Sequence, residues 1–475
     1  MPYILKSDIA LRGWRLVPRA YYMRGSGRAC KLTPEEFDIL IMCDGETAIA
    51  RSPELDRLMA RGLCVPASPD RVAENGDKLT QWQRYRFCDN RYFPAVNWAI
   101  TGRCNFNCRH CFNAADNAPL MSEFTWEQCR EFIQQLDECG VQNVTLTGGE
   151  PMLHPHFMDI CREIDRRGMV IEELTTNGSF ITPEMLDEFD RLGCKTLFKL
   201  SLDGIGHHDW FRDKHGAERD VIKKIKLLRS RGFHVRVQTN VHKGNIDTIL
   251  PTAKLADEMG VDEMRIIRTT EAPRWAQMGG DLCLGIAEYY GFGLDFIRAF
   301  LSEGLSINID IWQVFQIWPK QKLYHHRPVL GGVRSYRDSF PVCRDARGRI
   351  AVTPEGDILP CNQLSGLFKK QGLRMGNVHE TPLRELLSDS EYLQTVCHTA
   401  GELRKENPKC QACPHWKLCM GGCRAIGMLF GGSYSAYDPA KCVYFNDYLQ
   451  KFDALLGDDW HCVDEFDGSN THMEA

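Results

Sequence analysis

The 475-residue chain has no continuous apolar run long enough to cross a membrane. Its opening stretch, MPYILKSDIALRGWRLVPRA, lacks the apolar core and the cleavage site of a secretory signal peptide. The net charge is only −5, and the amino-terminal segment has no concentrated basic helix, which gives no reason to expect a nucleic-acid partner. We therefore expect a cytoplasmic protein that binds neither membranes nor nucleic acid.

Internal repeats and extended low-complexity tracts are also absent, while cysteine is abundant. Without a signal peptide, 21 cysteines favour metal binding or catalysis over disulfides. Ten of them fall into two patterned groups. The other eleven are scattered singly, and we expect these to pack as small apolar residues.

Residues 1–80 predict a small winged-helix-like module. YILKSDIALRGWRLVP and AYYMRG are typical of short strands. Thr33 opens a helix with a capping-box pattern, Ser52 opens a second helix that Gly62 can close, and LCVPA follows as a strand. The polar stretch after it is typical of a linker.

Residues 90–330 alternate strand-like and helix-like runs, which predicts an α/β fold with a parallel sheet curled into a partial (β/α)6 barrel. Function in such sheets gathers at the carboxyl ends of the strands. The expected strands are AVNWAIT, NVTLTGG, VIEELTTN, TLFKLSLDG, FHVRVQTNV and DEMRIIRT.

Residues 340–457 are rich in cysteine and show little periodicity, which predicts an irregular domain held together by metal. The acidic tail, residues 458–475, is expected to be solvated or frayed.

The first cysteine group is a C-x3-C-x2-C run of Cys104, Cys108 and Cys111, directly after the first barrel strand. A structural zinc site and a cubane iron–sulfur cluster each have four positions to fill. Three thiolates therefore leave one position open for chemistry. His110 and Cys129 are alternatives as a fourth ligand, although His110 lies awkwardly between Arg109 and Cys111.

This cysteine run, followed by GGEP after the second strand, resembles the radical S-adenosylmethionine (SAM) enzyme family. The resemblance implies that Cys104, Cys108 and Cys111 hold a catalytic [4Fe-4S] cluster, whose fourth iron is chelated by the SAM methionine group. It further implies that the reduced cluster cleaves SAM to a 5′-deoxyadenosyl radical, which takes hydrogen from an unactivated C–H bond. A low-potential electron donor, such as flavodoxin or ferredoxin, would be a partner.

The same resemblance assigns SAM-binding roles to nine residues. Glu150 would meet the methionine ammonium group, the residue before the third cysteine would lie against the adenine, and polar residues after the third and fourth strands would contact the ribose and the carboxylate. For the latter, ordinary turn chemistry is the alternative. The residues are His110, Gly148, Gly149, Glu150, Pro151, Thr176, Asn177, Ser201 and Asp203.

The second cysteine group resembles the SPASM domain of radical SAM enzymes, which carries two auxiliary [4Fe-4S] clusters. Three clusters in all are therefore implied. A single zinc ion, or thioredoxin-like redox chemistry, is the alternative for CQACPHWKLC alone. The outer cluster would be held by Cys410, Cys413, Cys419 and Cys442, and the inner one by Cys343, Cys361 and Cys423.

The inner set is one thiolate short of a closed cubane. Some relatives supply a further cysteine about six residues before the first, but Arg337 occupies that position here. We expect an open iron, with Cys283 or Cys397 as alternative ligands. An open iron would suit a substrate thiolate, and so thioether chemistry.

The amino-terminal module resembles the precursor-recognition domain of ribosomal-peptide maturases, which implies binding of a precursor peptide as an extra strand at a sheet edge. An ordinary winged-helix module, or packing support for the barrel, is the alternative. We therefore expect an oxygen-sensitive oxidoreductase that forms a thioether or another cross-link in such a peptide. The alternatives are a radical SAM enzyme that acts on a small molecule or tetrapyrrole or oxidises a protein Cys or Ser, and a zinc-stabilised peptide-binding protein.

Overall fold

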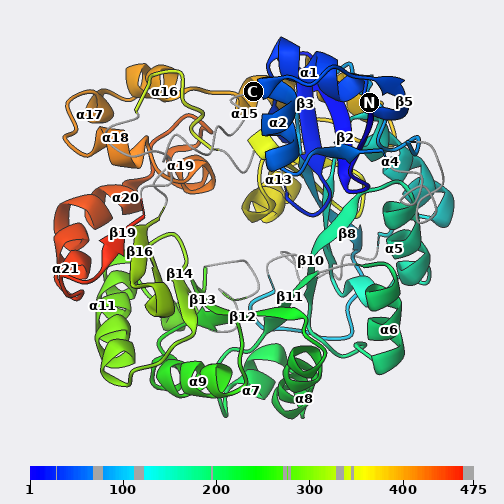
Figure 1. Cartoon of the computed structure of the whole chain (residues 1–475). Helices are drawn as coiled ribbons and strands as arrows, with labels where there is room; N and C mark the ends of the chain where they lie inside the picture. The colour runs from blue at the N-terminus through cyan, green and yellow to red at the C-terminus, as the bar shows by residue number, and fades with distance from the viewer. Residues whose placement is uncertain are drawn as a thin grey trace.

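Parallel strands β8 to β13 form the centre of a twelve-stranded sheet in the computed structural model of the chain (Figure 1). They lie side by side in chain order, as expected for successive βα units. The expected α/β fold is confirmed. The strands are β8 Ala95–Thr101, β9 Asn143–Gly148, β10 Val170–Thr176, β11 Leu197–Ser201, β12 His234–Val241 and β13 Glu263–Arg268.

The sheet continues beyond these six strands on both sides. Strand β14 pairs in parallel with β13, and β17 pairs in parallel with β8, although β17 lies far along the chain from its partner. Four short strands complete the two ends. The added strands are β14 Asn308–Ile311, β15 Phe315–Trp318, β16 Leu323–His326, β17 Arg349–Val352, β18 Ile358–Leu359 and β19 His461–Cys462.

Helices cover the outer face of the sheet. Helix α4 begins with a capping box between Thr125 and Gln128, and its buried Phe132 meets Trp98 of β8 edge-to-face at 5.0 Å between ring centroids. Side chains that alternate with these outward residues face the inside of the barrel. The helices of this part are α4 Trp126–Glu138, α5 Phe157–Arg166, α6 Pro183–Arg191, α7 His208–Arg212, α8 Ala217–Ser230, α9 Ile246–Glu258 and α11 Ile286–Ser302.

The amino-terminal module contains two small sheets, in the orders β5-β1-β6 and β4-β3-β2-β7. Strands β1 and β2, which form where YILKSDIALRGWRLVP was expected to be extended, belong to different sheets. Strand β5 follows the first helix and was not expected, because its conformation depends on pairing with β1. Strand β7 pairs with β2, so this module reaches past residue 80. Its elements are β1 Pro2–Leu5, β2 Ile9–Trp14, β3 Val17–Met23, β4 Ala29–Lys31, α1 Pro34–Ile41, β5 Asp44–Ala48, α2 Pro53–Ala60, β6 Cys64–Pro66 and β7 Arg86–Cys88.

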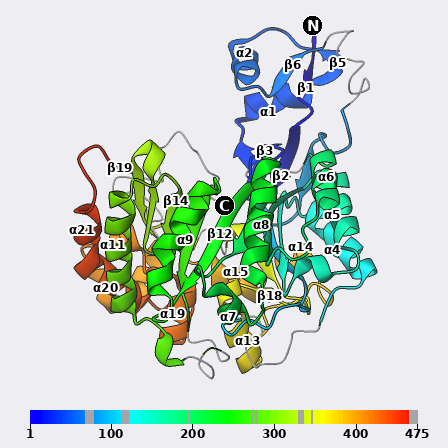
Figure 2. The ribbon, with the colours of Figure 1, turned by 90° about the horizontal axis from the view of Figure 1, so that it is seen from below.

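This module stands at the end of the barrel where the strands begin (Figure 2). The Asn143 side chain, at the start of β9, donates to the Gly27 carbonyl at 2.8 Å. Trp14 is fully buried, and its indole Nε1 donates to the Cys139 carbonyl at the end of α4 at 2.9 Å. The module is thus anchored to the barrel through buried contacts.

The carboxyl-terminal part is built from short helices, so the expectation of little regular structure is wrong in this respect. Most of them are too short for a helical repeat to be visible in the sequence. The start of the acidic tail is also ordered, since His461 pairs with Leu323 of β16. The helices are α13 Ser365–Gln371, α14 Leu383–Leu386, α15 Glu391–Val396, α16 Ala400–Glu406, α17 Pro408–Gln411, α18 Trp416–Cys419, α19 Arg424–Gly431, α20 Pro439–Val443 and α21 Leu449–Asp453.

The structure describes residues 1–27, 29–67, 79–111, 122–193, 196–270, 275, 280–327, 336–343 and 347–463. Most of the expected tail and part of the expected linker lie outside these ranges. Within them, no helix has the length and apolar character needed to span a bilayer.

Candidate active site and cluster-binding segments

The cysteine loop begins where β8 ends, and the segment after β9 holds it in place. Gly149 N donates to the Thr101 carbonyl and Glu150 N to the Arg103 carbonyl, both at 2.8 Å. A Cβ atom on Gly149 would lie 2.2 Å from the Arg103 carbonyl oxygen, and Gly148 has a φ of +144°. The two glycines are therefore needed for close approach of the chain's own backbone.

The three thiols of this loop lie close enough to influence one another. Cys111 N donates to the Cys108 carbonyl at 3.1 Å, and Phe106 N donates to Cys104 Sγ at 3.4 Å. Desolvation at the sulfur raises the pKa of Cys104, and the charges of Cys108 and Cys111 add to this shift. Burial also raises the pKa of Cys108. Neighbouring thiols of which two disfavour the charged form without a cation are suited to an iron–sulfur cluster.

Glu150 is fully buried beside this loop. Burial raises the pKa of its carboxyl group to about 7, although hydrogen bonds from Asn177 N, at 2.9 Å, and from Thr176 Oγ1, at 2.8 Å, favour the charged form. A buried carboxylate without a charged partner gains most from a cation brought by a ligand. Its environment therefore fits the ammonium group expected there.

The expected polar residues after β10 support Glu150 and the cysteine loop. Besides its bond to Glu150, Thr176 Oγ1 accepts from Gly178 N at 2.9 Å. The Asn177 side chain donates to Asn105 Oδ1 in the cysteine loop at 2.8 Å. Pro151 is buried at the start of a 3₁₀ turn, and Glu150 caps that turn by accepting from Met152 N at 3.3 Å.

His110 forms a flat face beside the thiols. Its ring stacks on Phe211 with 3.7 Å between centroids and 5° between planes. Burial lowers the pKa of His110 to about 3, so the ring is neutral, and its Nδ1 is buried without a hydrogen-bond partner. A neutral stacked ring with an unsatisfied nitrogen fits a position beside a purine.

Asp203 accepts hydrogen bonds from other groups of the chain. The Arg212 Nε donates to Asp203 Oδ2 at 2.5 Å, and Asn240 N donates to Oδ1 at 2.9 Å. Arg212 Nη1 in turn lies 3.7 Å from Cys108 Sγ as a hydrogen-bond donor. Asp203 thus positions a guanidinium beside a cluster cysteine, while Ser201 ends β11 opposite Gln238 of β12.

Sequence reasoning missed Arg212, Phe211 and Asn105. The first two lie on helix α7, within the segment HHDWFR that follows the LDG turn. A cation and an aromatic residue shortly after that turn were a usable signal, but only the tertiary structure shows that they reach the cysteine loop.

The four cysteines expected around the outer auxiliary cluster gather near α17, α18 and α20. Cys413 N donates to the Cys410 carbonyl at 3.3 Å. Burial raises the pKa of Cys410 to about 11, and the charges of Cys442 and Cys413 contribute. Burial also raises the pKa of Cys419, with a further contribution from Cys442.

The inner set lies closer to the barrel. Cys423 Sγ accepts a hydrogen bond from Gln313 Nε2 at 3.3 Å, at the turn between β14 and β15. Cys423 precedes α19, and Cys361 precedes the 3₁₀ turn Asn362–Leu364 that packs against α19. Burial, followed by the charges of Cys343 and Cys361, raises the pKa of Tyr434.

No group of three His, Cys, Asp or Glu side chains within the described part of the chain is compact enough to hold a single metal ion.

Comparison with known proteins identifies the class. The model of the radical SAM superfamily matches residues 98–256, and that of SPASM, an iron–sulfur cluster-binding domain, matches residues 343–414. The chain carries a radical SAM domain and a SPASM domain, and it is an enzyme that uses SAM and iron–sulfur clusters.

The curated relatives include heme synthases and peptide cyclases. The chain is 27% identical over 352 residues to an AdoMet-dependent heme synthase of Methanosarcina barkeri (strain Fusaro / DSM 804), covering 74% of this chain and 96% of the relative. It is 26% identical over 355 residues to a PqqA peptide cyclase of Streptomyces rochei, covering 72% and 87%.

Among solved structures, Streptococcus suis SuiB bound to the precursor peptide SuiA has a TM-score of 0.63 at 14% identity. This match covers 93% of this chain and 99% of SuiB. Native anSMEcpe with bound AdoMet has a TM-score of 0.56 at 18% identity, covering 76% and 97%. These likenesses show the fold.

Proposed function

We propose that this enzyme modifies a ribosomally synthesised precursor peptide, and that it forms a thioether or another cross-link after hydrogen abstraction. The observation that carries the proposal is the amino-terminal two-sheet module, which is packed on the barrel through Trp14. The match to SuiB bound to the precursor peptide SuiA extends over 93% of the chain and so includes most of this module.

The barrel residues have defined tasks in this proposal. Cys104, Cys108 and Cys111 hold the catalytic cluster, which together with SAM supplies a 5′-deoxyadenosyl radical when bound. Glu150 holds the ammonium group of SAM, and the His110–Phe211 stack orients its adenine. Gly148, Gly149 and Pro151 shape the loop, Thr176 and Asn177 hold Glu150, and Ser201 and Asp203 line the end of β11.

The position of the module sets a distance that a peptide must cover. Asn143, at the amino end of β9, contacts the module, whereas the cysteine loop follows the carboxyl end of β8. Barrel strands of seven or eight residues span about 25 Å. A peptide held by the module must therefore extend along the barrel to place its reacting residue at the cluster.

A tetrapyrrole is the second candidate substrate, because heme synthases are among the curated relatives. An anionic tetrapyrrole would gain from unmatched cations on the inner face of the barrel. Those cations are matched: Lys199 pairs with Glu173, Arg265 with Asp310 at 2.8 Å, and Arg349 with Glu172 at 2.9 Å. This charge balance on the described strands favours the peptide.

The two auxiliary clusters complete the proposal. Cys410, Cys413, Cys419 and Cys442 hold the outer one, and Cys343, Cys361 and Cys423 hold the inner one. Anaerobically prepared protein is expected to contain about twelve irons.

Replacement of Cys104, Cys108 and Cys111 by alanine should remove about four irons and all SAM cleavage. Cleavage that survives this change contradicts the placement of the active site.

The substrate class is tested with the reduced enzyme, SAM and synthetic peptides encoded by short reading frames beside this gene. Cross-linking is expected to lower the mass of one peptide by two hydrogen atoms, and protease digestion with tandem mass spectrometry locates the bond. Heme precursors offered in the same assay provide the matched comparison. Turnover of a tetrapyrrole without turnover of any peptide contradicts the proposal.

A further inference from the structure

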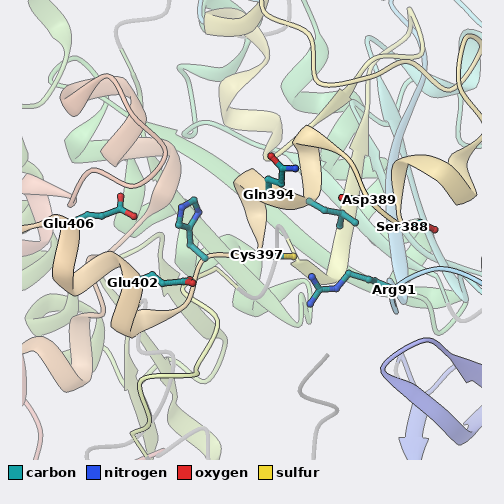
Figure 3. Close-up of a pocket in the computed structure, with 9 residues that line it drawn as sticks. Arg91, Ser388, Asp389, Gln394, Cys397, Glu402 and Glu406 are labelled. Atoms are coloured by element: carbon teal, nitrogen blue, oxygen red, sulfur yellow. The ribbon is translucent and has the colours of Figure 1, made fainter.

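Cys397 lies at the end of α15 and belongs to neither expected cysteine set. It is half-buried and lines a surface cavity of about 430 Å³ with Arg91, Leu393, His398 and Glu402 (Figure 3). Cys397 N donates to the Leu393 carbonyl at 2.9 Å, which fixes its backbone at the carboxyl end of the helix.

An antiparallel pairing brings the segment of Cys397 beside that of Cys343. Pro341 pairs with Thr399 as an isolated bridge. Val342 N donates to the His398 carbonyl at 3.3 Å, and Ala400 N donates to the Phe340 carbonyl at 2.7 Å. Cys343 and Cys397 each lie two residues from this bridge, on the same side of it, so the pairing brings the two cysteine-bearing segments together.

Two further side chains link the same cysteines. Arg347 N donates to the Cys343 carbonyl at 3.2 Å, and burial lowers the pKa of its guanidinium group while the neighbouring Cys397 offsets part of that shift. Tyr392, one helical turn before Cys397, is fully buried. Burial raises the pKa of its hydroxyl group, and the charges of Cys397, Cys343 and Cys361 contribute to the shift. All three thiols therefore lie around one buried phenol.

We propose that Cys397 is the fourth thiolate ligand of the inner auxiliary cluster, beside Cys343, Cys361 and Cys423. The inference rests on the proposed assignment of that cluster. Position 337, where some SPASM proteins carry a further cysteine, is arginine here, and the register instead supplies a thiol from the opposite segment. Cys283 lies elsewhere, just after the turn whose Leu282 carbonyl accepts from Lys243 N near the end of β12.

A fourth thiolate changes what this cluster does. With four cysteine ligands the cubane has no iron available to a substrate thiolate, so it serves electron transfer. This assignment replaces the open iron that the spacing of the motif alone predicts. Thioether formation then needs no direct bond between the substrate sulfur and the inner cluster.

The test uses full-length protein in which Cys104, Cys108 and Cys111 are alanine, so that only auxiliary clusters contribute to the spectra. We compare this parent with added Cys397→Ser, Cys283→Ser or Cys343→Ala changes by iron analysis and by EPR after reduction and after mild oxidation. We expect Cys397→Ser to change one cluster's reduced signal and, after oxidation, to lose about one iron of four to give a three-iron signal absent from the parent.

The controls separate the possible failures. Cys283→Ser is expected to match the parent. Parent-like spectra of Cys397→Ser, with altered spectra of Cys343→Ala, overturn the inference and leave the inner cluster in place. Parent-like spectra of Cys343→Ala overturn the cluster assignment itself, and the inference with it. Because a serine variant can misfold, Cys397→Asp, which retains an anionic ligand, is measured in parallel and should keep all irons with a shifted signal.

Discussion

Glu150 has no ion-pair partner among the described residues, although its carboxyl group is fully buried beside the cysteine loop. Three hydrogen bonds hold it in a fixed orientation, from Thr176 Oγ1 and from the backbone N–H groups of Asn177 and Met152. This arrangement orients the Glu150 carboxylate for an incoming cation. The free-energy cost of desolvating the carboxylate is met on folding, before SAM binds.

We expect SAM affinity to depend on pH through Glu150. Its pKa is raised to about 7, so the charged form that pairs with an ammonium group is lost as the pH falls below this value. The dissociation constant should rise about tenfold per pH unit below 7. Calorimetry between pH 5.5 and 8 checks this, and Glu150→Gln should bind weakly at every pH. A flat profile for the unchanged protein contradicts the assignment.

Arg212 is expected to tune the catalytic cluster. Its guanidinium group donates to Cys108 Sγ at 3.7 Å, and hydrogen bonds to cluster sulfurs and local positive charge favour the reduced state. Arg212→Gln should therefore make the cluster's reduction potential more negative, and Arg212→Lys should recover part of the shift, as measured by EPR-monitored redox titration.

Arg109 provides the matched control for that measurement. It lies next to Cys108 in the chain, but its side chain bonds to Asp213 at 3.1 Å and to the Trp210 carbonyl at 2.8 Å. Equal shifts in Arg109→Gln and Arg212→Gln would mean that general charge, and not the contact with Cys108, sets the potential.

At the scale of the elements, the inner face of the barrel strands carries a connected set of charges. Glu173 of β10 lies within reach of Lys199 of β11, Arg236 of β12 and Arg349 of β17. Burial alone would raise the pKa of Glu173, but the charges of Lys199 and Arg349 outweigh it and lower the value to about 2.

Glu173→Gln should destabilise the barrel, because it removes the carboxylate partner of Lys199 and one of the two partners of Arg236 and of Arg349. The expected loss is about 3 kcal/mol of unfolding free energy near neutral pH. In the unchanged protein this contribution is fully present above the ordinary carboxyl pKa and fades as the pH falls towards 2. Urea unfolding at pH 7 and at pH 3.5 checks both points, and a variant as stable as the parent at pH 7 contradicts them.

At the scale of the whole molecule, the amino-terminal module contacts the end of the barrel where the strands begin (Figure 2), whereas the cysteine loop follows the carboxyl end of β8. We expect that the recognised and the modified residues of the peptide must be at least about eight extended residues apart. Synthetic peptides with the intervening segment shortened one residue at a time should keep their affinity and lose turnover below that length. Turnover that persists with four intervening residues contradicts this path.

Trp14 connects the module to the barrel. Trp14→Ala removes a fully buried indole and its bond to the Cys139 carbonyl, at a cost of about 3–5 kcal/mol. Limited proteolysis should then release the module, while SAM cleavage without peptide stays near the parent rate. Leu16→Ala is the control, since Leu16 is 54% exposed. A Trp14→Ala protein with the parent's proteolysis pattern contradicts the docking.

Much of the fold follows from local sequence, because strands β8 to β13 carry their own signals. AVNWAIT becomes β8 from Ala95 to Thr101, and Thr125 caps α4 through its own side chain. The order of the βα units then fixes that the cysteine loop, Glu150 and Thr176 meet at one edge of the sheet. The class of the enzyme was therefore recognisable from the resemblance of the C-x3-C-x2-C run and GGEP, in this order of strands, to the radical SAM family.

The tertiary structure alone decided which distant segments meet. Strand β17 joins β8 from far along the chain, α7 brings Arg212 to Cys108, and the bridge between Pro341 and Thr399 brings the segments of Cys343 and Cys397 together. Such pairings depend on how the chain closes loops around a shared core, and no local propensity or motif spacing encodes that closure. The local motifs of the sequence thus indicated which cofactors the enzyme uses, and the folded chain determined which side chains lie around the cysteines.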